Sequence, residues 1–236
     1  MIKYIKKKIN RLFSSKKVMK IFYYSHKIFG EKKIGNINFD FSKKKNRIQI
    51  LQEIIDFKNY KSYLEIGTFK NEVFNKIKCE KKVGVDPVMG GTVRDTSDNF
   101  FFNNSEKFDI IFIDGLHEYH QVKKDIENSI NSLNEEGIIL IHDCLPINYY
   151  AQAVPRCVYE WNGDVWRAFV EVRTKDNLDS FCCYADEGIG VIKKRKNTNK
   201  LLTNFTDFSK IKYNYFFYNY KELMNLKEFN KILEII

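Results

Sequence analysis

The sequence predicts a three-layer α/β sandwich built on one mostly parallel sheet, and three observations predict it. Between residues 63 and 143, short apolar stretches of strand length alternate with longer stretches of helical periodicity. Four of the apolar stretches carry an acidic residue at or near their carboxyl end. Strands that alternate with helices at this spacing are joined by right-handed crossovers, which make the strands parallel. Further short strands downstream predict an antiparallel C-terminal edge.

The composition supports one such domain with additional segments at its ends. The chain has 236 residues, of which 44% are hydrophobic and 15% aromatic, enough to fill a core. The net charge of +10 is concentrated in residues 1–47, which contain fifteen Lys or Arg residues and two acidic ones. Because the remaining chain is slightly acidic, basic charge does not surround the expected crevice, and nucleic acid is not expected as a partner.

Cysteine usage and hydropathy indicate a cytoplasmic protein. The five cysteines include no C-x-x-C pair, and we expect all of them to be reduced thiols. The early lysines are not followed by the apolar segment of a signal peptide, and no apolar run is long enough to span a membrane.

We divide the chain into a basic amphipathic arm (1–47), a domain (48–194) and an aromatic-rich extension (195–236). The arm is predicted to form a helix with lysines around one apolar face. That face consists of Ile5, Ile9, Leu12 and Phe13. Two interpretations remain open: an interfacial helix that contacts anionic lipid or an acidic partner, or a helix packed on its own domain or on a second subunit. The extension is expected to pack on the domain or on the partner subunit of a homodimer.

The elements are predicted in the following order. A helix over 47–57 leads into the sheet, because its apolar residues recur at helical spacing. Parallel strands are predicted at 62–67, 81–86, 108–114 and 138–142, with a short additional strand and a turn in 92–104. Helices are predicted over 71–78 and 116–134, the latter with a buried stripe at Val122, Ile126, Ile130 and Leu133. The C-terminal edge is predicted from AFVEVRT (168–174), SFCCYA (180–185) and GIGVIKK (188–194), and YNYFFYNY (213–220) is either core or a dimer contact.

Acidic residues at the strand ends predict a binding crevice. They are Glu65, Asp86, Asp114 and Asp143. In open parallel sheets, ligands bind outside the carboxyl ends of the strands, and a carboxylate after the second strand is placed to accept hydrogen bonds from a ribose. Gly67 does not begin the G-x-G-x-x-G turn that a pyrophosphate prefers, which disfavours NAD.

With its E-x-G turn, its acid after the second strand and FDIIFIDGLHEY, the chain resembles the class I S-adenosylmethionine-dependent methyltransferases, which have a Rossmann-like fold. TSDNFF, IDGLHEYHQVKKDI, GIILIHDCLP and WNGDVWRAFV are similar to the subgroup that includes macrocin-type and rhamnosyl O-methyltransferases. The resemblance covers roughly residues 48–194. It implies methyl transfer to an oxygen of a sugar or sugar-linked acceptor in surface polysaccharide (capsule) or glycoside biosynthesis. A phosphorylated or phosphoramidate-type acceptor remains an open variant.

The resemblance also implies the residues that bind S-adenosylmethionine. Glu65, Gly67 and Thr68 would contact its amino-acid end, and Asp86 its ribose. Ser97 or Asp98 would lie beside the adenine. Asp114, after the third of the long strands, would complete the cofactor site.

His117 is the predicted general base, acting beside Asp114 and Asp143. It follows Asp114 by three residues at the start of a helix, where the positive helix end should favour the neutral imidazole. The alternative is that His117 only caps the helix or bonds Asp114. The resemblance further implies a divalent metal such as Mg²⁺ on Asp114, Asp143 and His142, although His142 stands where relatives carry an acid. Otherwise the two carboxylates only bond cofactor or acceptor.

Residues 155–167 are the predicted acceptor contacts, because aromatic faces with interspersed charge suit a carbohydrate. The contacts are Trp161, Asp164, Trp166 and Arg167, and the alternative is that the tryptophans are core. Two rival functions remain: a NAD-dependent sugar-modifying oxidoreductase, and a non-enzymatic adaptor with a degenerate fold that contacts the inner face of the membrane through the basic arm.

Overall fold

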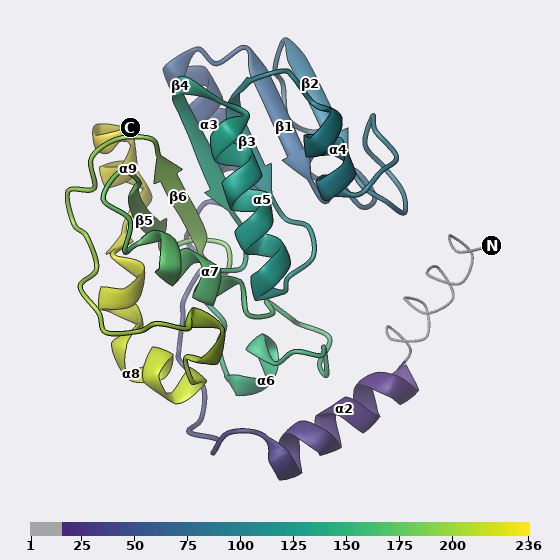
Figure 1. The fold of residues 1–236 in the computed structure, drawn as a ribbon, viewed down its shortest axis with the longest axis vertical. Helices are drawn as coiled ribbons and strands as arrows, with labels where there is room; N and C mark the ends of the chain where they lie inside the picture. Colours follow the sequence, from purple (N-terminus) through teal and green to yellow (C-terminus); the bar gives the residue numbers. More distant parts are fainter. Residues whose placement is uncertain (1–15) are drawn as a thin grey trace.

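A computed structural model describes residues 16–236, and the apolar face predicted at residues 5–13 lies outside the described residues. Its centre is a seven-stranded sheet with helices on both faces (Figure 1). The strands are β1 (Ser62–Ile66), β2 (Lys81–Val85), β3 (Phe108–Ile113), β4 (Leu133–Ile141), β5 (Asp179–Cys183), β6 (Ile189–Lys193) and β7 (Leu226–Lys227). The helices are α2 (Lys16–Phe29), α3 (Arg47–Lys58), α4 (Ser97–Asn103), α5 (Tyr119–Asn131), α6 (Tyr149–Gln152), α7 (Val165–Val172), the 3₁₀ turn η1 (Phe208–Lys210), α8 (Tyr213–Met224) and α9 (Phe229–Ile235).

The strand order is β2-β1-β3-β4-β6-β5-β7. β1 pairs in parallel with β2 and β3, and β3 pairs in parallel with β4. β6 is antiparallel to both of its neighbours, β4 and β5. The predicted Rossmann-like sandwich with an antiparallel C-terminal edge is therefore confirmed.

Strand side chains alternate between two apolar layers, as the pleat of a buried strand requires. On one face, Ile110 and Phe112 of β3 join the apolar residues of α3 and α9. On the other, Ile111 and Ile113 join a cluster that includes buried residues of α5, α7 and α8. Because each face of the central strands is covered, the exposed polar groups of the sheet are left at the strand ends.

Three predicted elements differ in the structure. Residues 71–78 do not form a helix but begin with turns, because Phe69 and Asn71 adopt left-handed backbone conformations (φ 44° and 64°) where the helix would start. The predicted strand in 92–104 is reduced to a single bridge between Val85 and Val93, and α4 follows it. Residues 168–172 belong to helix α7 and residues 173–174 form a turn, so this segment is not a strand.

Helix α7 shows why the last of these predictions was wrong. Its apolar side chains Val165, Ala168, Phe169 and Val172 recur at the i, i+3, i+4, i+7 positions of a helix, and all are buried. The period becomes visible only when the segment is taken to begin at Val165.

The two ends of the described chain pack on the domain. Tyr23 of α2 stacks on Tyr150 of α6 with ring centroids 4.7 Å apart, and α2 lies along that edge in Figure 1. Tyr213 and Phe216 of the extension are fully buried in the main core, so one face of YNYFFYNY is core. Within residues 16–236, no helix combines the length and apolarity needed to cross a bilayer.

Candidate functional site

The carboxyl ends of β3 and β4 bring three predicted catalytic residues together. Asp114 follows β3, Asp143 lies two residues beyond β4, and the His117 ring lies between their carboxylates. His117 Nε2 is 3.3 Å from Asp114 Oδ1, and Nδ1 is 3.1 Å from Asp143 Oδ2. Trp161 stacks against the imidazole, with centroids 5.4 Å apart and planes 20° from parallel. The cluster is therefore a histidine held between two acids against an aromatic wall.

The His117 imidazole is charged at neutral pH in this arrangement. Burial lowers its pKa, but the charge of Asp143 and the hydrogen bond to Asp114 outweigh burial and raise the pKa to about 8. The expectation of a neutral imidazole is therefore wrong, because two close carboxylates outweigh the partial charge of a helix end. His117 is not the cap of α5: Glu118 is the N-cap residue, and Asp164 Oδ1 accepts the first amide, that of Tyr119.

His142 forms the floor of the cluster. Its Nδ1 is 3.1 Å from Asp143 Oδ2 and 3.5 Å from Asp114 Oδ1, and its Nε2 is 2.9 Å from the carbonyl of Asp186. Burial opposes the charged ring, but the charges of Asp143 and then Asp114 raise the pKa of His142 well above its ordinary value. His142 thus serves the two carboxylates as a second buried cation.

Arg47, which sequence reasoning missed, supplies a third cation. Its Nη1 donates to Asp114 Oδ2 at 3.0 Å, and its Nε donates to Asp186 Oδ2 at 3.0 Å. Nη1 also lies 3.1 Å from His142 Nδ1, a contact between like charges that the shared Asp114 carboxylate compensates. The pKa values of Asp114 and Asp143 remain below their ordinary range: burial raises them, but His142 and His117 lower them further.

Asn162 and Glu187 complete the surroundings of Asp143. Asn162 Nδ2 donates to Asp143 Oδ1 at 2.6 Å and to Glu187 Oε2 at 2.9 Å. Burial and the neighbouring Asp143 raise the pKa of Glu187 to about 7. Asp143, Asp186 and Glu187 all have positive φ angles (65°, 42° and 60°), a conformation that non-glycine residues seldom adopt and that clusters at functional sites.

The donor set does not fit the predicted Mg²⁺. Asp114, His117 and Asp143 offer one ligand atom each within 4.8 Å of one another, which is close enough for a metal. Mg²⁺, however, requires near-octahedral oxygen ligands with several waters. Here Arg47 holds Asp114 Oδ2, Asn162 holds Asp143 Oδ1, and the other two carboxylate oxygens face the protonated histidines.

Gly67 and Thr68, two of the predicted cofactor residues, lie directly after β1 at the neighbouring part of the same edge. Gly67 (φ 92°) lies so close to the chain after β3 that a Cβ would be 2.2 Å from the Asp114 carbonyl. Beside it, the hydroxyl of Thr68 is buried without a hydrogen-bond partner among the described residues. An unpaired buried hydroxyl costs stability, so a ligand atom that pairs with it is favoured.

The Asp86 side chain is bonded to the backbone of the loops around it. Its carboxylate accepts the amides of Phe69 (2.8 Å), Val88 (2.7 Å) and Met89 (2.9 Å). A carboxylate offers about four acceptor positions, so roughly one remains for a ribose hydroxyl unless the loop moves.

The other predicted cofactor residues differ in accessibility. Glu65 is buried and accepts a 2.5 Å hydrogen bond from Tyr63; burial raises its pKa to about 7. Ser97 begins α4, and Gln121 of α5 donates to the side chains of both Ser97 (3.2 Å) and Asp98 (2.9 Å). The Ser97 and Asp98 side chains are therefore tied to α5, whereas Glu65 points into the protein.

Of the predicted acceptor contacts, Trp161 places its ring against His117, and Asp164 reaches His117 through its backbone amide, which donates to the His117 carbonyl at 3.2 Å. Asp164 pairs with Arg167 at 2.9 Å and caps α5, and Arg167 also donates to the carbonyl of Ile211. Trp166 is fully buried and packs against Phe216 in the core, which leaves none of its surface for an acceptor.

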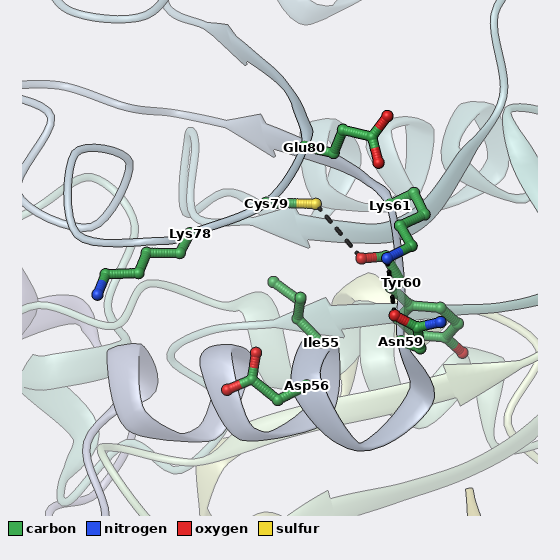
Figure 2. Close-up of a pocket in the computed structure, with 8 residues that line it drawn as sticks. All are labelled: Ile55, Asp56, Asn59, Tyr60, Lys61, Lys78, Cys79 and Glu80. Carbon is green, nitrogen blue, oxygen red and sulfur yellow. Dashed lines mark hydrogen bonds between the residues drawn. The ribbon is translucent and has the colours of Figure 1, made fainter.

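The hollow drawn in Figure 2 lies elsewhere. It is formed where β1 and β2 begin, at the sheet edge opposite Asp114 and His117. The thiol of Cys79 there donates to the carbonyl of Tyr60 at 3.7 Å (Figure 2). The site is therefore assigned from the convergence of strand ends rather than from this hollow.

Residues 45–144 match a family described as a methyltransferase domain. This segment is similar to that methyltransferase domain. It begins just before α3 and ends just after β4, and it contains Arg47, His117, Asp114 and Asp143. The prediction of a methyltransferase is confirmed, and the macrocin-type subgroup is not distinguished by this match.

No curated protein matches the chain. Similar solved structures include the methyltransferase PaMTH1 of Podospora anserina bound to S-adenosylhomocysteine, with 16% identity over 66% of this chain and 81% of that one and a TM-score of 0.48. An O-methyltransferase of Bacillus cereus, also bound to S-adenosylhomocysteine, has 13% identity over 63% and 80% of the two chains and a TM-score of 0.46. The MycE methyltransferase of the mycinamycin pathway, with Mg and S-adenosylhomocysteine, has 14% identity over 65% and 50% and a TM-score of 0.42.

Proposed function

We propose that the chain is an S-adenosylmethionine-dependent O-methyltransferase. The observation that carries this proposal is the His117 ring between Asp114 and Asp143, beside the glycine turn at Gly67 in the methyltransferase domain. The turn at Gly67 packs tightly against the Asp114 backbone, and the unpaired hydroxyl of the next residue, Thr68, would suit a polar atom of a cofactor. Asp86 would hold the ribose, and Ser97 and Asp98 would lie beside the adenine. The bound cofactor supplies an electrophilic methyl group.

The chain's own residues would orient the acceptor and take its proton. Methyl transfer is an in-line displacement, so alignment of the acceptor oxygen contributes much of the rate. We assign His117 Nε2 as the atom that accepts the hydroxyl proton, because its contact with Asp114 is the longer of the two. The Trp161 carbonyl, 3.2 Å from Nδ1, would accept its proton in a hydrogen bond and fix the ring, and the charge of Asp143 at 3.1 Å would favour that proton. The proton ends on His117, and Asp114 and Asp143 stabilise the charge it creates.

The acceptor we propose is a sugar or sugar-linked group of a surface polysaccharide or glycoside. Trp161 supports this, because its ring forms one wall beside His117 and aromatic faces bind the apolar faces of sugars. Arg156, whose guanidinium lies 5.6 Å from the Trp161 ring, would accommodate a phosphorylated or phosphoramidate-type acceptor. Such pathways operate in the cytoplasm and at the inner face of the membrane, where we place the enzyme.

The arm would bring the site to that surface. Exposed apolar side chains on α2, among them Ile21 (65% exposed) and Ile28 (69%), have lysines around them. Because α2 packs on α6, it lies at the same edge of the sheet as the strand ends. The face of α8 that carries the exposed Tyr218 would form the contact of a homodimer.

Thermal-shift measurements and a labelled-methyl acceptor screen test the function. S-adenosylhomocysteine should raise the melting temperature, whereas NAD should not. Nucleotide sugars and polysaccharide fragments should then accept label from S-adenosylmethionine. Stabilisation by NAD alone would favour the oxidoreductase, and binding to anionic vesicles without either nucleotide ligand would favour the adaptor.

A further inference from the structure

Arg47 ties two separate parts of the site together. Its backbone amide and its Nε both donate to Asp186 Oδ2 (2.5 and 3.0 Å), and its Nη1 donates to Asp114 Oδ2. Asp114 follows β3, whereas Asp186 lies in the turn between β5 and β6. One guanidinium thus bridges carboxylates that are far apart in the sequence, which a planar fork of five donors does better than an ammonium group.

The position of Arg47 in its helix points to a role outside the helix. It is the first residue of α3, and a capping box between Asn46 and Gln49 fixes that start. A cation at a helix N-terminus opposes the helix dipole, so Arg47 does not stabilise α3 by its charge. The carboxylates of Asp114 and Asp186 supply the compensation instead.

The three carboxylates that contact basic groups are matched by them in number, and a fourth acid, Glu187, shares Asn162 with Asp143. Three carboxylates (Asp114, Asp143 and Asp186) face three basic groups (Arg47, His117 and His142) through the contacts described above. A divalent ion at Asp114 would have to share Oδ2 with Arg47 or Oδ1 with the two histidines. The carboxylates that would attract a metal are already neutralised by the chain itself.

We propose that Arg47 is the resident cation of this site, a positioning residue that holds Asp114 and takes the place of a divalent metal. This inference rests on the proposed function, because the cluster is taken to be the active site. The metal-binding experiment does not depend on that function. On this proposal, the chain differs from a metal-dependent methyltransferase through one side chain, Arg47, which lies outside the sequence motifs at the strand ends.

Mn²⁺ binding, followed by electron paramagnetic resonance on the full chain, tests the proposal without requiring turnover. Any Mn²⁺ binding by the wild type should be unchanged by Asp114→Asn. Arg47→Ala should gain at least about tenfold in Mn²⁺ affinity, since it frees two carboxylates, and Arg47→Ala combined with Asp114→Asn should lose that gain. Lys45→Ala, which removes a nearby cation paired with Glu53, is the matched control and should behave like the wild type.

Three results would overturn the proposal. One is Mn²⁺ binding by the wild type that Asp114→Asn removes. The second is a folded Arg47→Ala variant that gains no Mn²⁺ affinity, and the third is loss of wild-type turnover in EDTA with recovery on adding Mg²⁺. If Arg47→Ala does not fold, Arg47→Gln replaces it, and the wild-type measurement still decides. A failure to bind S-adenosylhomocysteine would count against the methyltransferase function and leave these results interpretable.

Discussion

His117 illustrates how neighbours decide the state of a catalytic group. In a loop that enters a helix its ring would be neutral near pH 7, but between Asp114 and Asp143 it binds a proton more tightly. As a base it must first lose that proton. The same two carboxylates then favour its return, because the imidazolium formed during the reaction lies between them.

Replacing His117 should remove turnover and leave cofactor binding intact. His117→Gln should lower kcat by about 10²- to 10⁴-fold, the usual contribution of a general base, with little change in S-adenosylhomocysteine affinity. His120→Ala is the control, since His120 is exposed and only packs edge-on against Tyr119. Single-turnover kinetics and calorimetric titration measure the two quantities. Unchanged turnover in His117→Gln would assign the proton to another acceptor.

The rate should rise with pH through the titration of His117. Its pKa is about 8, so the charged ring predominates below that value and cannot accept a proton, whereas the neutral ring predominates above it. We expect kcat/KM to increase about tenfold per pH unit below 8 and to level off above it. In His117→Gln this rise should be absent. A wild-type profile that is flat between pH 6 and 9 would contradict the assignment.

At the scale of elements, the start of α3 links stability to the site. Asn46 Oδ1 accepts the backbone amide of Gln49, and Gln49 Oε1 accepts the backbone amide of Asn46. The next residue is Arg47, so the cap that fixes the helix also fixes the guanidinium against Asp114.

Removing the Asn46 cap should weaken both the stability of the protein and its turnover. Asn46→Ala should destabilise the protein by about 1 kcal/mol, the usual cost of losing an N-cap side chain. It should also lower turnover beyond the fraction that is unfolded, because Arg47 loses its fixed starting point. Asn148→Ala removes the same type of cap from α6 and should change stability without the second effect. Chemical denaturation measures the stability of the two variants, and kinetics at matched folded fractions compare their turnover. Equal turnover in the two variants would show that the start of α3 does not affect the site.

The sequence predicts those elements whose signals are local. The four long parallel strands and the residues at their ends follow from apolar runs and neighbouring acids, and Asp114, His117 and Asp143 are close together in the structure. Arg47 and Asp186 are 139 residues apart in the chain, so no local pattern marks their pairing. Trp166 has the composition of a binding residue, but the packing of α7 against Phe216 makes it core.

At the scale of the whole molecule, charge and apolar surface are divided between two parts. The basic residues are concentrated in the arm, whereas the cluster at the strand ends pairs three carboxylates with three basic groups. The two parts are joined at α6, where Tyr23 stacks on Tyr150 and His26 Nε2 contacts the carbonyl of Pro155. The chain then runs from Pro155 to Trp161, so a surface that binds the arm would lie near the acceptor wall.

Anionic vesicles should bind the protein through α2. Ile21 and Ile28 lie two turns apart on one side of the helix, and burying such side chains contributes about 1.5–3 kcal/mol each. Ile21→Asp combined with Ile28→Asp should therefore weaken vesicle binding at least about tenfold. Cosedimentation with vesicles that contain phosphatidylglycerol measures this, and binding should fall as salt is raised because the lysines are screened. Leu202→Asp, on an exposed residue of the extension, should bind like the wild type. If the α2 variant binds vesicles as tightly as the wild type, α2 does not bind the membrane, and a protein partner would be the expected ligand of this helix.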